Sequence, residues 1–168
     1  LTIAEMAEIF EMRGFGPARA FQTAARNTEA VSDLDPAARD LEGYLFPATY
    51  ELDGTETAVS LLQLLVDTMY EHLDDAGVPV EMRHEILTKA SIVQREAGSN
   101  QDDFYKIARV FQNRIDQGIN LQSDATVAYG TGNLHTVWTT DAERADASNP
   151  YNTYANAGLP IGPIGLPG

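Results

Sequence analysis

The sequence contains no cysteine, and its 11 basic residues are far outnumbered by 25 acidic ones. Without cysteine the chain has no disulfide, no thiolate zinc site and no cysteine nucleophile, although this does not assign it to a compartment. The formal net charge of -14 and the lack of a basic stripe argue against a nucleic-acid binder and against adsorption to an anionic membrane. Any anionic substrate would have to be bound by hydrogen bonds and stacking.

Motifs for metal and cofactor chemistry are missing or incomplete. The His-Glu pair at 84–85 starts like a zincin helix, but position 88 is threonine, so the second zinc ligand is missing. The Gly-Thr-Gly at 130–132 lacks the third glycine of a dinucleotide fingerprint, and there is no phosphate-binding loop and no serine-hydrolase elbow. We therefore expect no metal and no cofactor, which leaves acid–base chemistry with carboxylates.

The sequence contains no apolar run long enough to span a membrane, and we expect no signal peptide within these residues. The 168 residues, 43% of them hydrophobic, suit one domain, or one domain with a small appendage. The chain starts without Met and stops at Gly168 within a motif, so we expect it to be a fragment of a longer protein.

The spacing of apolar residues predicts a mainly helical chain. Turn and capping residues set the expected helices at 2–14, 17–26, 56–76, 79–98 and 102–118. A short helix is expected from Ser123 or Asp124, and a helical turn after Thr140. The segment 41–50 packs aromatics around a Gly and a Pro, which favours an extended or turning segment and, most simply, a core strand.

The stretch KASIVQREAG (89–98) ends one of these helices on a carboxylate, Glu96. A helical wheel places Glu96 at the border of an apolar face, where we expect its side chain to be half-buried. Gly98 ends the helix, so Glu96 lies in the last turn, where the helix dipole disfavours a negative charge. Both effects favour the protonated carboxyl that a general acid requires, although Lys89 and Arg95 could oppose them. The alternative is a solvated glutamate at a helix end.

Two further segments are dense in polar side chains. The first consists of Gln122, Ser123, Asp124 and Thr126 and could bind sugar hydroxyls. Helix capping alone would explain one of these four residues. The second, from Asn149 to the end, is rich in Gly and Pro, which suggests rigid backbone passing close to another group. Asn152 and Tyr154 would then offer side-chain contacts, whereas a plain surface loop is the alternative.

Five blocks together resemble the endolytic murein transglycosylases of the YceG-like family and occur in that family's order: LEGYLFPATY (41–50), ASIVQREAG (90–98), VFQNRIDQG (110–118), LQSDATVAYG (121–130) and NPYNTYANAGLPIGPIGLPG (149–168). The resemblance covers residues 41–168, while the first forty fit more loosely. It therefore predicts a C-terminally truncated catalytic domain over 41–168. Residues 1–40 would be a helical or linker portion, either the end of a LysM-like region or the start of the catalytic domain.

The resemblance implies a lytic transglycosylase that cuts the MurNAc-β-1,4-GlcNAc bond within peptidoglycan strands and leaves 1,6-anhydromuramoyl ends. Such enzymes work outside the cytoplasm in the bacterial envelope, usually on one N-terminal membrane helix and beside peptidoglycan synthases. The family's catalytic glutamate maps onto Glu96. The chain departs from the family pattern at Gln94, where an acidic residue is frequent, at Ala125, where proline is common, and at Ala48, where Asp is usual.

One carboxyl group is enough for this reaction. As a hypothesis, Glu96 protonates the glycosidic oxygen, and the C6 hydroxyl of the muramic acid attacks while Glu96 takes back a proton. An internal nucleophile has a large effective concentration, so no water and no second carboxylate are required. The substrate-binding residues are expected to be Glu42, Tyr44, Gln122, Ser123, Asp124, Thr126, Asn152 and Tyr154.

Three other functions remain open from the sequence. A muramidase would hydrolyse the same bond, with Asp124 or Glu42 directing water or acting as nucleophile. The aminodeoxychorismate lyase label once given to this family would need pyridoxal phosphate, for which two lysines and no phosphate cradle are poor support. A glycan-binding or scaffold module would bind without turnover. For the fold we expect the α+β class, a helix-rich catalytic domain with a smaller β or extended portion and a substrate cleft between them.

Overall fold

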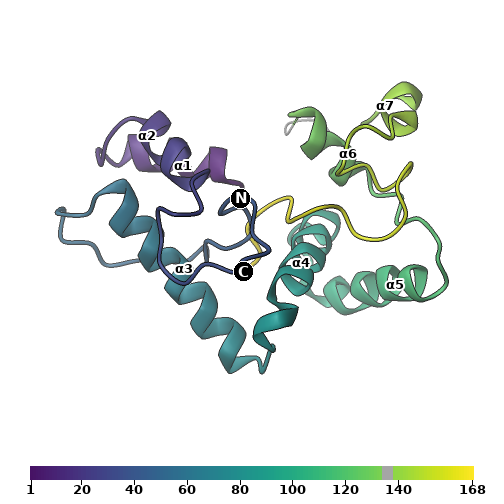
Figure 1. Cartoon of the computed structure of the whole chain (residues 1–168), viewed down its shortest axis with the longest axis horizontal. Helices are drawn as coiled ribbons and strands as arrows, with labels where there is room; N and C mark the ends of the chain where they lie inside the picture. Colours follow the sequence, from purple (N-terminus) through teal and green to yellow (C-terminus); the bar gives the residue numbers. More distant parts are fainter. Residues whose placement is uncertain (134–137) are drawn as a thin grey trace. The chain divides into compact units, whose positions relative to one another are not determined.

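The computed structural model describes residues 1–133 and 138–168. Secondary structure within these ranges is helical (Figure 1), and no strand occurs in them. No described helix combines the length and the apolar character needed to cross a bilayer. The helices are α1 (Ile3–Met12), α2 (Ala18–Ala25), α3 (Ala58–Asp75), η1 (Val80–Met82), α4 (Arg83–Ala97), η2 (Gln101–Asp103), α5 (Phe104–Asp116), α6 (Asp124–Thr131) and α7 (Asp141–Ala145).

The prediction of a smaller β portion is wrong for the described residues. Segment 41–50, for which the sequence favoured an extended or turning segment and most simply a core strand, forms no strand and turns at 41–45, with Gly43 at a φ of 86°. Its backbone bonds to helices rather than to a neighbouring strand, since Leu41 N–H donates to Ala25 O at 2.9 Å and Phe46 N–H to Leu65 O at 3.1 Å. Leu41, Tyr44 and Leu45 are buried, and Phe46 and Tyr50 are half-buried against the same core. The helix-rich character and the turning segment are thus confirmed, whereas the β portion is not.

The chain forms two compact units. Unit 1 consists of Leu1–Leu87 with Gly165–Gly168, and unit 2 of Thr88–Ile164. Helix α4 begins in unit 1 and ends in unit 2. The boundary that the sequence suggested after residue 40 was drawn on family resemblance, and it stays a prediction, as does the substrate cleft.

Unit 1 packs α1, α2 and α3 around segment 41–50. The N-cap Thr2 accepts a hydrogen bond from Glu5 N–H at 3.3 Å, which fixes the start of α1. Glu42, 5% exposed, accepts from Ile3 N–H through both carboxylate oxygens at 3.1 and 3.3 Å. The chain ends meet here, because Leu166 N–H donates to Leu1 O at 2.7 Å. Buried hydrogen bonds thus tie distant segments to the first helix.

Unit 2 contains the end of α4 together with α5, α6 and α7. Its core is a small apolar cluster of Ile92, Val93, Phe111, Leu121 and Ile164. Ser91, 1% exposed, donates to Thr88 O at 2.7 Å and accepts from Ile164 N–H at 3.0 Å. The Gly- and Pro-rich C-terminal segment is thereby fastened to α4, the helix that carries Glu96.

Candidate active site

Glu96 lies in the last turn of α4, as the sequence predicted. Gly98 follows with a φ of 59° and turns the chain away. The Glu96 side chain is exposed rather than half-buried, since α4 ends one residue later at Ala97 and offers no following turn of its own to cover it. Its Oε1 accepts a hydrogen bond from the Ser123 hydroxyl at 2.5 Å. A carboxyl group that is open to solvent and held by one defined donor is therefore the centre of the candidate site.

Ser123 is the N-cap of α6, but its side chain makes no capping hydrogen bond. The residue is 2% exposed, and its own N–H donates to the Thr153 hydroxyl at 3.0 Å. Because the Ser123 backbone is fixed and its hydroxyl is not used for capping, the hydroxyl can donate to Glu96. The sequence pointed to Ser123 or Asp124 as a cap, and this partner across 27 residues could not be seen in the local pattern.

Two buried threonines, Thr126 and Thr153, form hydrogen bonds with the backbone of Ser123. Their hydroxyl oxygens are 2.8 Å apart, and Thr126 donates to Ser123 O at 2.7 Å. Gln122, whose side chain is exposed, adopts a φ of 55° and donates its N–H to Thr153 O at 3.1 Å. A positive φ in a residue other than glycine is uncommon and often occurs at functional sites. Thr126 is fully buried, so its contacts are those of a supporting residue.

A second polar group surrounds Asp124, the first residue of α6. The Asp124 carboxylate accepts hydrogen bonds from the Thr139 hydroxyl and from Arg144 Nε, the latter at 3.1 Å. Arg144 also donates to the Thr139 hydroxyl at 2.8 Å, and its guanidinium carbon lies 5.1 Å from the centre of the Tyr154 ring. Sequence reasoning missed Arg144, because no local pattern relates it to a carboxylate twenty residues earlier.

Tyr154 belongs to the same neighbourhood as both carboxylates. Burial raises the pKa of Tyr154, and the negative charges of Asp124 and Glu96 raise it further, while Arg144 lowers it. The net shift is upward, so the phenol is protonated at neutral pH and can donate a hydrogen bond. Unit 2 therefore brings together Glu96, Ser123, Asp124 and Tyr154 of the predicted residues.

Asn152 is fully buried and makes its contacts with backbone. Its Nδ2 donates to three carbonyl oxygens at the end of α7, those of Glu143 at 3.1 Å, Arg144 at 3.0 Å and Asp146 at 2.8 Å. Its Oδ1 accepts from Tyr154 N–H at 2.9 Å. This amide shapes the turn that presents Tyr154, and direct contact with a substrate stays a prediction.

Glu42 and Tyr44, the remaining predicted residues, belong to unit 1. Tyr44 is fully buried, and its hydroxyl contacts His84 Nδ1 at 2.9 Å and donates to Asp35 Oδ2 at 3.3 Å. The pKa of Tyr44 is raised well above its usual range, first by burial and then by the charge of Asp35. Its partners and those of Glu42 are typical of residues that stabilise a core, and their contact with a substrate also stays a prediction.

The helix α6 also depends on a glycine beside Asn149. A Cβ added to Gly130 would lie 2.0 Å from Asn149 Oδ1, an atom that accepts a hydrogen bond from Tyr151 N–H at 3.0 Å. Within a helix, alanine is normally more stable than glycine by about 0.5–1 kcal/mol. We expect Gly130→Ala instead to lower the free energy of unfolding by about 1–3 kcal/mol, because Asn149 is displaced.

Urea denaturation followed by circular dichroism measures this effect, and Asn149→Ala provides the control. In that background the added methyl group meets no amide, so Gly130→Ala should cost clearly less than in the parent. Equal costs in the two backgrounds would show that the contact does not explain the glycine.

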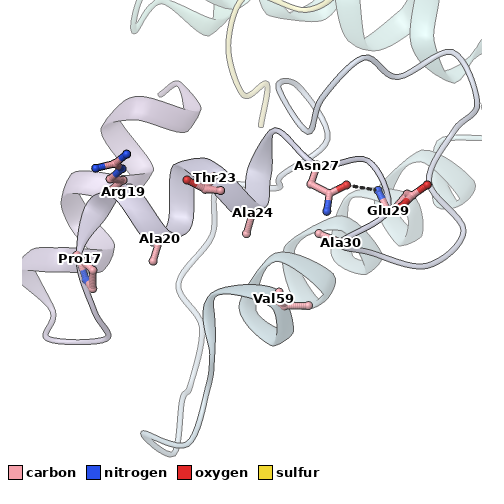
Figure 2. A pocket seen from close by; sticks show the side chains of 9 residues that line it. All are labelled: Pro17, Arg19, Ala20, Thr23, Ala24, Asn27, Glu29, Ala30 and Val59. Atoms are coloured by element: carbon pink, nitrogen blue, oxygen red, sulfur yellow. Dashed lines mark hydrogen bonds between the residues drawn. The ribbon is translucent and has the colours of Figure 1, made fainter.

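A pocket of about 780 Å³ lies elsewhere, in unit 1 between α2 and the start of α3 (Figure 2). Its lining is largely methyl and aliphatic, and the Asn27 side chain accepts from Glu29 N–H at 3.0 Å beside it. None of the predicted site residues lines this pocket. Within 1–133 and 138–168, no three acidic or histidine side chains are grouped so that they could hold a metal ion.

Comparisons with known proteins agree on one family. A model of the YceG-like family matches residues 1–168. The chain is 35% identical over 147 residues to an "Endolytic murein transglycosylase" of Streptococcus pneumoniae serotype 2 (strain D39 / NCTC 7466), covering 83% of this chain and 26% of the relative. It is 36% identical over 130 residues to a protein of that name from Bacillus subtilis (strain 168), covering 74% and 35%. The chain thus spans only about a quarter to a third of the length of these relatives.

A solved structure agrees with these sequence matches. The crystal structure of a YceG-like protein from Listeria monocytogenes superposes with a TM-score of 0.82 at 31% identity. The superposition covers 100% of this chain and 60% of that one.

Proposed function

Since the chain belongs to the YceG-like family, we propose that it carries the catalytic site of an endolytic murein transglycosylase, acting on the glycan strands of peptidoglycan. The names of the relatives support the reaction class. The observation that carries the proposal in this chain is the hydrogen bond from Ser123 to Glu96, which gives one exposed carboxyl a fixed orientation beside a polar surface.

The proposed reaction uses Glu96 as both acid and base. Its proton passes to the glycosidic oxygen as the bond from that oxygen to C1 of the muramic acid breaks. The C6 hydroxyl of the same sugar then attacks C1, and its proton returns to Glu96, so a 1,6-anhydro ring forms without water. Ser123 holds Oε1, which leaves Oε2 to approach the substrate. Because atoms and protons balance within the substrate and one carboxyl group, no second catalytic carboxylate is required.

The surroundings of the other carboxylates favour this reaction over hydrolysis. A muramidase needs a second carboxylate that directs water or attacks the sugar. Asp124 Oδ1 accepts hydrogen bonds from both Thr139 and Arg144. The Glu42 carboxylate is buried in unit 1 and accepts a hydrogen bond from Ile3 N–H. Both groups are thus engaged in holding the protein's own segments, which supports the mechanism with a single carboxyl.

We further propose that Gln122 and Tyr154 contact the glycan. Gln122 is exposed and directly precedes Ser123, the donor to Glu96. Tyr154 is protonated at neutral pH and could donate to an acetamido or hydroxyl oxygen of the glycan. Asn152 and Thr126, both fully buried, would act by fixing the turn and the helix start that position these groups. For the whole protein we propose work in the bacterial envelope, outside the cytoplasm, on an N-terminal membrane anchor and beside peptidoglycan synthases.

Digestion of purified peptidoglycan tests the proposal. The sizes of the soluble fragments released over time are measured by chromatography and mass spectrometry. Cuts within strands should give a broad range of multi-disaccharide fragments from the earliest times. Release of disaccharides alone would indicate cutting from strand ends, and binding without release would indicate a glycan-binding module; either result would overturn the proposal.

A further inference from the structure

Trp138 is the only tryptophan of the chain, and it is 82% exposed. Indole is large and mostly apolar, so tryptophan is usually well buried in folded proteins. At this exposure most of the apolar indole surface is accessible from solvent, and a flat apolar surface of a ligand could pack against it. Its place in the chain decides what that surface could be.

The backbone after Trp138 is fixed to the polar group of the candidate site. Thr139 donates to Asp124 and accepts from Arg144, and Thr140 caps α7 by accepting from Glu143 N–H at 3.2 Å. Neighbouring Cα atoms are about 3.8 Å apart. The Cα of Trp138 is therefore at about this distance from the Cα of Thr139, whose side chain donates to Asp124. Asp124 in turn follows Ser123, the donor to Glu96. The backbone that carries the exposed indole is thus held next to the polar group around Asp124.

We propose that Trp138 is a stacking subsite for one pyranose ring of the glycan strand, beside the Glu96 site. The inference rests on the proposed function for the class of substrate. A pyranose ring with equatorial substituents presents a face of C–H groups, which are attracted by the electron-rich face of indole. Tryptophan also orders few rotatable bonds on binding, so little conformational entropy is lost.

The charge of the chain supports stacking as a source of affinity. With a net charge of -14 the protein cannot attract a carboxylate-bearing strand by overall charge, so binding has to come from hydrogen bonds and apolar contact. Gln122 and Tyr154 offer the hydrogen bonds. Trp138 supplies the apolar contact that these polar groups lack.

The single indole makes the test direct. Peptide-free glycan strands are titrated into the Glu96→Gln variant, which does not consume them, while tryptophan emission is recorded. We expect a saturable change in emission intensity or wavelength, with the same midpoint as isothermal titration calorimetry. Saturation by calorimetry with unchanged emission would overturn the subsite.

Variants separate stacking from a general effect on the fold. In the same Glu96→Gln background, Trp138→Ala should weaken strand binding by about 3- to 10-fold, whereas Trp138→Phe should stay within about threefold because it keeps an aromatic face. Tyr105→Ala is the matched control, since Tyr105 is an aromatic of unit 2 that is 86% exposed on α5. It should bind as the parent does.

The outcomes also distinguish this inference from the proposed function. Binding by the parent and equally tight binding by Trp138→Ala would overturn the subsite alone. No strand binding by any variant would contradict the substrate class and thereby both proposals. In the active protein, Trp138→Ala should raise KM with kcat nearly unchanged, because the ring binds the strand and takes no part in proton transfer.

Discussion

Replacing Glu96 with glutamine is expected to lower the rate of glycan cleavage by about 10²- to 10⁴-fold, the contribution of a positioned general acid–base. The amide has the shape of the carboxyl, and its oxygen can still accept the hydrogen bond from Ser123, but it cannot release a proton to the glycosidic oxygen. Strand binding should therefore persist while turnover is lost. The initial rate of fragment release from purified peptidoglycan measures the effect.

The control for this loss lies on the same helix. Glu85 is an exposed glutamate in the first turn of α4, and Glu85→Gln makes the same chemical change away from the site. It should retain the parent rate. Glu96→Gln should also unfold at the same urea concentration as the parent, because Glu96 is exposed and forms no ion pair with the residues that the structure describes. Full activity of Glu96→Gln would contradict the proposed mechanism.

Replacing Asn152 with alanine is expected to lower the free energy of unfolding by about 3–5 kcal/mol, at the upper end for single substitutions. The side chain is fully buried, and its removal takes the amide donor from the carbonyl oxygens of Arg144 and Asp146 and the acceptor from Tyr154 N–H. Each unsatisfied buried group costs about 1–3 kcal/mol. Urea denaturation followed by circular dichroism measures the change.

Two further variants sharpen this test. Asn152→Asp keeps the shape and the acceptor but puts a carboxylate against carbonyl oxygens, so it should destabilise about as much as Asn152→Ala. Asn156 is the matched control, because it is only partly buried while its Nδ2 likewise donates to backbone, to Asn149 O at 3.1 Å and Asn152 O at 3.2 Å. Asn156→Ala should cost about 1 kcal/mol. Equal stabilities of the Asn152→Ala variant and the parent would contradict the role given to this amide.

The helices were largely predictable because their ends depend on nearby residues. The turn glycines Gly77 and Gly118 follow α3 and α5 with positive φ, and Pro17 directly precedes α2, as the sequence indicated. The short helix after Ser123 and the turn after Thr140 are confirmed as α6 and α7. In each case the controlling interaction spans only a few residues.

The strand expected over 41–50 was wrong because a strand, unlike a helix end, depends on a partner elsewhere in the chain. Aromatic and β-branched residues fit a strand only when a second strand offers backbone partners, and the pattern of one segment cannot show whether such a strand exists. In this chain Phe46 N–H bonds to Leu65 O of α3 instead. Burial was foreseen correctly, but the backbone partner was not.

The centre of the candidate site was predicted from α4 alone, whereas its surroundings required distant contacts. Glu96 followed from the helix end and from the family block around it. Its donor Ser123, the Arg144 pairing with Asp124 and the bonds of Asn152 to α7 join segments separated by 6 to 27 residues. Such pairings arise from tertiary packing, so a local pattern indicates the residue types and not their partners.

Cleavage in water enriched in heavy oxygen tests the central claim most directly. Purified strands are digested by the parent chain, and the new muramoyl ends are analysed by mass spectrometry. If Glu96 directs the sugar's own C6 hydroxyl to C1, the new ends are 1,6-anhydromuramoyl, lighter than reducing ends by one water and free of the label. Reducing ends that carry the heavy oxygen would show that water attacks C1, and would contradict a mechanism in which one carboxyl group acts without water.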